Sequence, residues 1–336
     1  MMASLLILAA LSASPVQQAP SAQTQPVSSA SSTATVTDPA DSEDPQVWLK
    51  AMSQALTHDD FVLSLVKVQN GRLQPFRYEH GLVDGKVIEH LVFLNGPPRE
   101  VVRRGSVVTL LDTEHQPFSY RSDSIRGPIP DALIGPAAAL SQYYDLVLAG
   151  NSRIAGRSAQ LLRIVPKDKY RHGYWIWIDR QSYLPLRVDR VTQRSGVVEQ
   201  LMVVDMNVTK TPSEHLQKVA KASFPAPASG VVQSDPKALG KVNWLPPGFK
   251  PVTANYHHLA LLGDGVDYWL FSDGLAEIAV YINPNAPNQE LTVHKRGYYN
   301  VVGVNHNGIE VMAVGTVPTA ALEQVAGQVS LRRQQP

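Results

Sequence analysis

The chain has 336 residues and 44% hydrophobic content, enough for two domains of ordinary size with sizeable cores. With 30 basic and 29 acidic residues the net charge is +1, so no global field favours nucleic acid or an anionic membrane. The absence of cysteine excludes disulfides, thiolate metal sites, cysteine nucleophiles and a lipid-modified anchor cysteine.

The N-terminus has the pattern of an export signal. The apolar run Leu5–Ala13 is too short to span a bilayer and has the length of a signal-peptide core. No Lys or Arg precedes it, and the small residues that follow leave the cleavage site open. A disordered tail that happens to begin apolar is the alternative. We predict a signal peptide over 1–22, then a disordered Ser/Thr/Ala-rich leader over 23–44. No later run approaches 18 apolar residues, so the mature protein should be soluble.

Order is expected to begin with a helix near Pro45. Asp44 can cap it, and Pro45 suits its first position. A long region of short strands follows, broken by turn signals such as Asn70-Gly71 and Asp84-Gly85, whose residues supply the positive φ angles of tight hairpins. Prolines then bracket two short helices between Gly127 and Tyr144, after which strands resume. This order predicts one curved antiparallel sheet with helices on its concave side.

The segment Tyr174–Ile178 reads YWIWI and is apolar on both faces of a strand. One face can meet the core, so we expect the other to meet helices, a partner or an apolar cavity. We assign four residues to a ligand-binding apolar cavity: Trp175, Trp177, Leu133 and Tyr143.

A segment rich in Pro, Ala, Ser and Lys separates two bodies. We predict a first domain over 45–212, a linker over 213–239 with a helix at Glu214–Lys221, and a small α+β domain over 240–332. The last body contains five strand-like runs and a final helix that Thr319 is expected to cap.

Motifs for catalysis are absent: the sequence contains no G-x-S-x-G, H-E-x-x-H, Walker or Rossmann pattern. His257-His258 makes a poor chelate, because adjacent residues on a strand point to opposite faces. We therefore expect no enzyme activity, no cofactor and no metal.

Four arginines are candidates for contact with an anion or a partner carboxylate: Arg99, Arg103, Arg104 and Arg171. The first three can equally form the solvent face of a strand. For Arg171 we favour a solvated hairpin tip in the charged loop Asp168–His172.

Two motifs are interpreted as structural anchors. Trp244-Leu245-Pro246-Pro247-Gly248-Phe249 combines a proline-fixed backbone with flanking aromatic rings. Ser272-Asp273-Gly274 is a turn signature between strands. The anchor residues are Trp244, Pro246, Pro247, Phe249, Asp273 and Gly274.

Several of these pieces occur together in order: LNGPPREVVRRG, SQYYDLVLAG with SRIAGR, WIWID with LPLRVD, WLPPGF and FSDGL. In this order and spacing they resemble the RseB/MucB family of periplasmic sigma-E regulators, over about Pro45–Leu331. The resemblance implies an unclosed antiparallel β-barrel of LolA/LppX type with helices on its concave side, plus the smaller α+β domain. The uncharged start of the leader and its length depart from the family pattern.

The function that the resemblance implies is regulatory. Proteins of this family bind the periplasmic region of an anti-sigma-E factor of RseA or MucA type and hinder its cleavage by a DegS-type protease. Lipopolysaccharide or the acyl chains of mislocalised lipoprotein are the implied signals. A periplasmic lipid or lipoprotein carrier is the alternative, although such a carrier would not need the second domain. The resemblance implies no nucleic-acid partner and no integral membrane segment.

Overall fold

The computed structural model describes residues 39–125, 127–135, 137–192, 196–227, 240–252, 267–283, 292–296, 299–306 and 308–331. The predicted signal peptide and His257-His258 lie outside these ranges, as do residues 23–38 of the leader and 228–239 of the linker. Within the ranges, no helix combines the length and the apolar character needed to cross a membrane.

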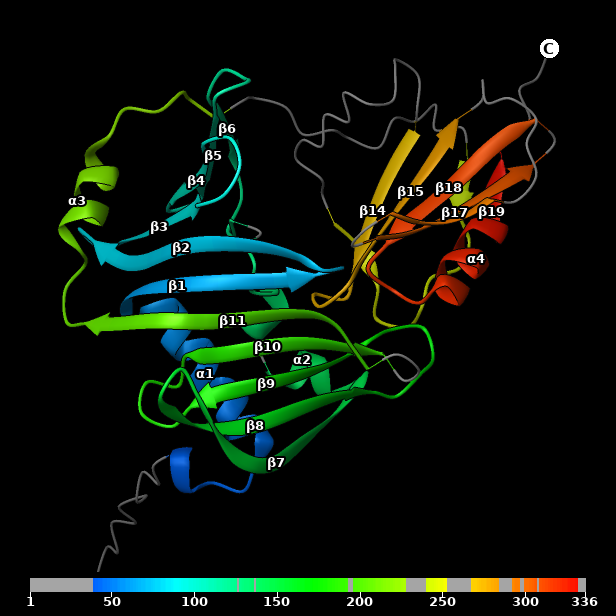
Figure 1. Ribbon diagram of the computed structural model, residues 1–336. Coiled ribbons are helices and arrows are strands. Elements are labelled where there is room, and N and C mark those ends of the chain that lie inside the picture. Colours follow the sequence, from blue (N-terminus) through cyan, green and yellow to red (C-terminus); the bar gives the residue numbers. More distant parts are fainter. Residues whose placement is uncertain are drawn as a thin grey trace, which may run out of the picture. The chain divides into compact units, whose positions relative to one another are not determined.

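The first sheet has eleven antiparallel strands in the order β6-β5-β4-β3-β2-β1-β11-β10-β9-β8-β7 (Figure 1). Its two edges, β6 and β7, do not pair, so the predicted unclosed sheet is confirmed. The strands are β1 (Asp60–Gln69), β2 (Arg72–Val83), β3 (Lys86–Phe93), β4 (Arg99–Arg104), β5 (Val107–Asp112), β6 (Phe118–Arg121), β7 (Tyr144–Ile154), β8 (Arg157–Pro166), β9 (Gly173–Asp179), β10 (Pro185–Thr192) and β11 (Gly196–Thr209).

Tight turns and alternating side chains explain this sheet. Asn70 and Asp84 have φ angles of 49° and 50°, and the glycine after each has 72°, as the predicted hairpins require. Alternate residues of β1, namely Phe61, Leu63 and Leu65, are buried. We call the side that these residues occupy the helix-bearing face, and the other side the outer face.

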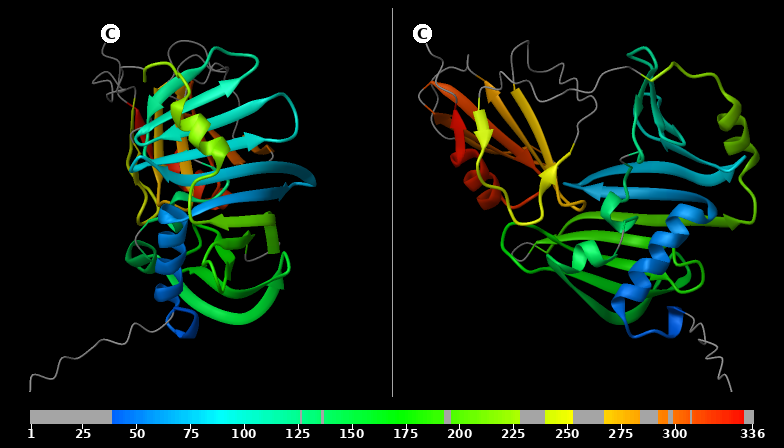
Figure 2. Two further views of the ribbon diagram at one scale, coloured as in Figure 1. Left: turned by 90° about the vertical axis from the view of Figure 1, so that its left-hand side faces the viewer. Right: turned by 180° about the vertical axis from the view of Figure 1, so that it is seen from behind.

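Two helices, α1 (Pro45–His58) and α2 (Ala137–Ser141), lie against the helix-bearing face (Figure 2). The carboxylate of Asp44 accepts a hydrogen bond from the backbone N–H of Gln46, and Pro45 occupies the first turn, so the predicted start of α1 is confirmed. The side chains of Trp48, Leu49 and Met52 are fully buried against the sheet. Two short 3-10 helices also occur, η1 (Pro39–Asp41) and η2 (Asp131–Leu133).

The last residues of the predicted leader have partners in the folded chain, while its boundary stays a prediction. Residues 39–44 pack against the first sheet unit: Arg180 donates to the carbonyl of Ala40 at 2.7 Å, and the Trp48 indole donates to the carbonyl of Ser42 at 2.9 Å. The carbonyls of Ala40 and Ser42 thus accept hydrogen bonds that the composition of the leader did not predict.

The expected helix in the predicted linker forms as α3 (Glu214–Lys221), and it packs on the outer face against β2 and β3. Leu216 is buried there beside Gly81. Arg104 donates to the carbonyls of Ala220 and Ala222, at 3.1 and 2.6 Å. Residues 213–222 therefore belong structurally to the first sheet, while the domain boundaries at 212 and 240 stay a prediction.

A second sheet of six strands has the order β13-β14-β15-β18-β17-β16. Helix α4 covers it, packing on β17 and β18, and a separate two-stranded pair joins β12 to β19. A second hydrophobic core forms here, with Ile278, Val280 and Leu322 among its fully buried members. The elements are β12 (Gly240–Val242), β13 (Lys250–Pro251), β14 (Asp267–Ser272), β15 (Glu277–Asn283), β16 (Thr292–Arg296), β17 (Tyr299–His306), β18 (Ile309–Gly315), α4 (Thr319–Gly327) and β19 (Val329–Leu331).

The predicted cap of the last helix is wrong. Pro318 is the N-cap residue, with no side-chain hydrogen bond, and Thr319 is already the first residue of α4. The fixed φ of proline, here −54°, lets the chain enter the helix one residue earlier than the threonine signal indicated.

Candidate functional site

A cavity of about 500 Å³ lies on the helix-bearing face of the first sheet. Helix α1, strands β2 to β4 and the segment 122–135 contribute its walls. Much of the lining is apolar: Leu56, Tyr78, Ile125, Ile129 and Ile134. The opening is thus suited to a partly apolar ligand.

A charged pair forms one polar part of the cavity wall. Arg103 Nη1 lies 2.6 Å from Glu89 Oε2, and the hydroxyl of Tyr78 donates to Glu89 Oε1 at 2.5 Å. Burial, followed by the charge of Glu89, raises the pKa of Tyr78 well above its usual value, so the phenol remains a donor. Burial lowers the pKa of His80, which keeps that lining imidazole neutral near pH 7. The Arg103–Glu89 pair thus lies in a partly apolar wall that also contains the carboxylates of Asp123 and Asp131.

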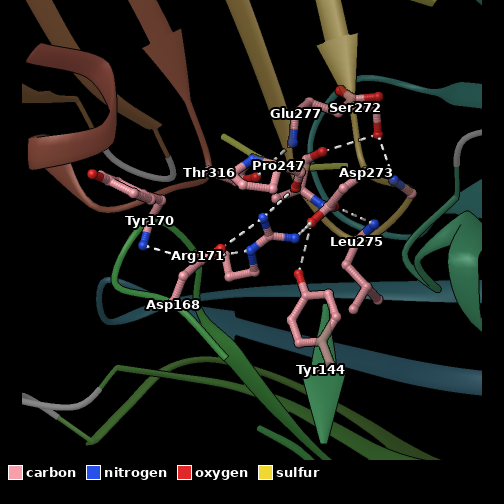
Figure 3. A network of polar contacts seen from close by, with 12 residues as sticks. Tyr144, Asp168, Tyr170, Arg171, Pro247, Ser272, Asp273, Leu275, Glu277 and Thr316 are labelled. Atoms are coloured by element: carbon pink, nitrogen blue, oxygen red, sulfur yellow. Dashed lines mark hydrogen bonds and ion pairs between the residues drawn. The ribbon is translucent and has the colours of Figure 1, made fainter. Parts of the chain in front are cut away.

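A second polar cluster joins the two sheets (Figure 3). Arg171, in the loop after β8, is fully buried; its Nη1 is 2.9 Å from Asp273 Oδ2, in the turn after β14. The same guanidinium contacts Asp168 at 2.9 Å and donates to the carbonyl of Pro247. The hydroxyl of Tyr144, at the start of β7, donates to Asp273 at 2.8 Å. We call Arg171, Asp168, Asp273, Tyr144 and Pro247 the junction.

Aromatic rings enclose the junction. The Arg171 guanidinium lies 5.3 Å from the ring centres of Tyr143 and Tyr144 and 5.6 Å from that of Phe249, distances typical of cation–π contact. Burial opposes its charge, but the hydrogen bond to Asp168 and nearby negative groups outweigh this and raise the pKa of Arg171. Burial and the neighbouring Asp273 also raise the pKa of Tyr144. The junction therefore carries a permanent, well-partnered charge.

The turn Ser272–Ala276 docks on the first sheet through its backbone. The hydroxyl of Tyr174 donates to the carbonyl of Leu275 at 2.9 Å, and the N–H of Ala132 donates to the carbonyl of Gly274 at 3.0 Å. Gly274 has a φ of +92°, and a Cβ there would approach the Cβ of Ala132 to 2.9 Å. Only glycine fits both that conformation and that closeness.

The four predicted cavity residues do not line the cavity. Trp175 and Trp177 lie on the outer face, whereas the cavity is on the helix-bearing face. Arginine guanidinium groups cover both rings: Arg187 lies 4.5 Å from the ring centre of Trp177, and Arg163 lies 5.6 Å from that of Trp175. Arginine stems and cation–π contacts thus cover this apolar strand face, and a ligand contact of the two tryptophans stays a prediction.

The other two predicted cavity residues serve packing. Leu133 is fully buried in the first core, and Tyr143 faces the junction, where its ring would lie 2.5 Å from a Cβ placed on Gly248. Leu133 therefore packs inside the first core and the half-buried Tyr143 lies beside the junction, while a ligand contact of either stays a prediction.

The four predicted anion-contact arginines are dispersed. Arg103 pairs with Glu89 in the cavity wall, Arg104 holds the end of α3, and Arg171 is buried in the junction. Arg99 is exposed, with its guanidinium 4.6 Å from the Phe93 ring centre. The solvated hairpin tip expected at Arg171 is wrong, because that side chain is buried against Asp273, 102 residues away in the sequence.

Two of the predicted structural anchors, Pro247 and Asp273, belong to the junction, and Phe249 lies against its guanidinium. Trp244 meets Tyr170 edge to face with ring centres 5.0 Å apart, and the carbonyl of Pro246 accepts from the N–H of Phe249 at 3.2 Å. Asp273 Oδ1 accepts from the N–H groups of Leu275 and Ala276, at 3.0 and 2.8 Å, which fixes the turn. One carboxylate oxygen of Asp273 therefore fixes the turn, and the other oxygen pairs with Arg171.

Sequence reasoning missed the cavity wall and the tyrosine of the junction. Glu89 and His90 interrupt the apolar run Val87–Phe93 of β3, which was an available signal that these two positions do more than pack. Tyr144 carried no such signal, because its partner Asp273 lies 129 residues away.

We predict that Arg171→Met lowers the free energy of unfolding by about 3–5 kcal/mol, since it leaves the carboxylate of Asp273 buried without its cation. The urea midpoint of the full chain measures the effect. Arg153→Met, at an exposed arginine of β7, is the matched control and should change the stability by less than about 0.5 kcal/mol. Equal midpoints for the two variants would contradict the importance of the junction.

Comparison with known proteins places the chain in a family. Residues 44–228 match the MucB/RseB N-terminal domain, and residues 236–330 match the MucB/RseB C-terminal domain. MucB of Pseudomonas aeruginosa, a sigma factor AlgU regulatory protein, is 29% identical over 307 residues, covering 86% of this chain and 91% of that protein. RseB of Escherichia coli, a sigma-E factor regulatory protein, is 29% identical over 282 residues, covering 84% and 89%.

Solved structures agree with these sequence matches. MucB in the Pseudomonas aeruginosa MucA/MucB complex has a TM-score of 0.68 and 26% identity, covering 87% of this chain and 100% of that one. MucB crystallised alone has a TM-score of 0.61 and 25% identity, covering 87% and 99%. The resemblance drawn from the sequence motifs is confirmed, and the chain belongs to the MucB/RseB family.

Proposed function

We propose that this chain is a periplasmic regulator that binds the periplasmic region of a membrane-spanning anti-sigma factor of MucA or RseA type. The observation that carries the proposal is its likeness, over 87% of its length, to MucB in complexes with MucA. Bound there, the chain hinders cleavage of the anti-sigma factor by a DegS-type protease. It acts by binding, not by catalysis.

Partner binding is proposed to need both sheets held together. The junction supplies the physical basis, because its buried charges are satisfied only when Asp273 and Pro247 of the second body meet Arg171. A partner that contacts both sheets gains from a docked arrangement that is already formed. A ligand that favours a different arrangement weakens the partner's affinity by linkage, typically by about 5–150-fold.

Lipid sensing is proposed for the cavity on the helix-bearing face. Burial of an acyl chain against Leu56, Ile129 and Ile134 contributes about 0.8 kcal/mol per methylene. The Arg103 guanidinium in the same wall is chemically suited to a phosphorylated headgroup, at the cost of disturbing its pair with Glu89. Lipopolysaccharide and lipoprotein acyl chains both contain the required apolar part.

A periplasmic lipid or lipoprotein carrier is the alternative function. The cavity alone would serve it equally well. The second sheet, with its own core and its buried connection to the first, favours the regulator, because a carrier needs neither.

We predict that the full chain retains the periplasmic segment of its cognate anti-sigma factor in a pull-down, and that added DegS-type protease then cleaves that segment more slowly. Contact with the segment hinders the protease, which needs an extended substrate. A cleavage rate unchanged by a saturating amount of the chain would contradict the regulatory role, even if binding were seen.

We predict that Ile134→Trp binds the partner segment as the unsubstituted chain does but no longer releases it with lipopolysaccharide, because the indole fills the cavity. Val147→Trp, at an exposed valine of β7, is the control and should still respond. The measurement is partner affinity with and without lipopolysaccharide. An unaltered response of the Ile134 variant would remove the cavity from the sensing mechanism.

A further inference from the structure

Three side chains from separate elements converge on the outer face of the first sheet. The potential ligand atoms of Glu79 (β2), His90 (β3) and His215 (α3) all lie within 4.8 Å of one another. Glu79 and His90 are buried, whereas His215 is exposed. The group lies on the sheet face opposite to the cavity and takes no part in the junction.

A carboxylate behind His90 sets the state of its ring. Nε2 of His90 is 2.7 Å from Glu100 Oε2, so the ring proton is held on Nε2. In the neutral ring this leaves the lone pair of Nδ1, which faces His215 Nε2 at 3.0 Å. A histidine whose far nitrogen donates to a carboxylate is the arrangement by which proteins orient and strengthen metal-binding imidazoles.

Glu79 supplies an anionic oxygen to the same place. Its side chain is 1% exposed and carries hydrogen bonds from Arg77 Nε at 2.8 Å and from the Ser213 hydroxyl. These two hydrogen bonds hold the carboxylate of Glu79 in position.

We propose that Glu79, His90 and His215 form a binding site for a divalent cation of the Zn²⁺ class. Two imidazole nitrogens and one carboxylate oxygen are a donor set that zinc accepts, with a fourth position for water on the exposed side of His215. Mg²⁺ and Ca²⁺ prefer sites made of oxygen ligands alone, so they match this set poorly.

The two imidazole nitrogens need only a small adjustment to bind one cation. Nitrogens bound to Zn²⁺ at about 2.0–2.1 Å in tetrahedral geometry lie roughly 3.4 Å apart, compared with the 3.0 Å between the two imidazoles. His215 can make this movement because it is exposed near the start of the eight-residue α3. The bound cation would fasten α3, and with it the chain leaving the first sheet, to β2 and β3.

A direct hydrogen bond between His90 and His215 is the competing explanation of the short contact. In that case the pair needs no cation, and Zn²⁺ binds no better here than at other surface histidines. The site does not depend on the proposed regulatory function, so its test uses metal binding alone.

The experiment is calorimetric titration of the untagged full chain with ZnCl₂, and with MgCl₂ for comparison, at neutral pH. The variants are His215→Ala, Glu100→Gln and the control His115→Ala. His115 is an exposed histidine near a carboxylate, Asp112, but lies outside the cluster. Because His215 is exposed and Glu100 is half-buried, both variants are expected to fold, which circular dichroism checks.

We expect Zn²⁺, and not Mg²⁺, to bind at a high-affinity site in the unsubstituted chain and in His115→Ala. His215→Ala should weaken that site at least tenfold, and Glu100→Gln should weaken it about 10–100-fold through the orientation of His90. Replacement of Zn²⁺ by Co²⁺ should give the visible absorption of a four-coordinate site, which His215→Ala abolishes. Zn²⁺ affinity that is equal in His215→Ala and His115→Ala, or no binding to the unsubstituted chain, would overturn the proposal.

Discussion

The buried pair between Arg171 and Asp273 is the constraint on which the arrangement of the two sheets depends. Neither side chain is more than 1% exposed, so each charge has lost its water and must be satisfied within the protein. The loop after β8, the WLPPGF segment and the turn after β14 each contribute partners. These three segments must therefore meet together, because a partial set would leave a charge buried and unpaired.

Such a pair contributes specificity more clearly than stability. Well-packed apolar residues often match the stability of a buried ion pair, but they accept several packings, whereas the planar guanidinium accepts few. The close approaches of Gly248 to Tyr143 and of Gly274 to Ala132 restrict the docking further. The second sheet thus meets the first in one defined manner, which suits a protein proposed to recognise a partner with both.

Local features of this fold could be predicted from sequence, and long-range ones could not. The hairpin turn at Asn70-Gly71 and the helix start at Asp44 depend on neighbouring residues alone, so the sequence predicts both correctly. The YWIWI strand was predicted at the correct place. The arginines of β8 and β10 that cover its tryptophan rings were not predicted, because their positions depend on the register between strands. Arg171 looked solvated because its partner Asp273 lies 102 residues away, and the Glu79–His90–His215 group spans similar distances along the chain.

The central claim is that the junction holds both sheets as one partner-binding unit, and a double-mutant cycle on partner affinity tests it most directly. Binding of the anti-sigma factor's periplasmic segment would be measured for Arg171→Met, Asp273→Asn and the double variant of the full chain. The account predicts that each single variant weakens binding and that the double variant binds no more weakly than the worse single one. Three variants that bind as tightly as the unsubstituted chain would contradict it.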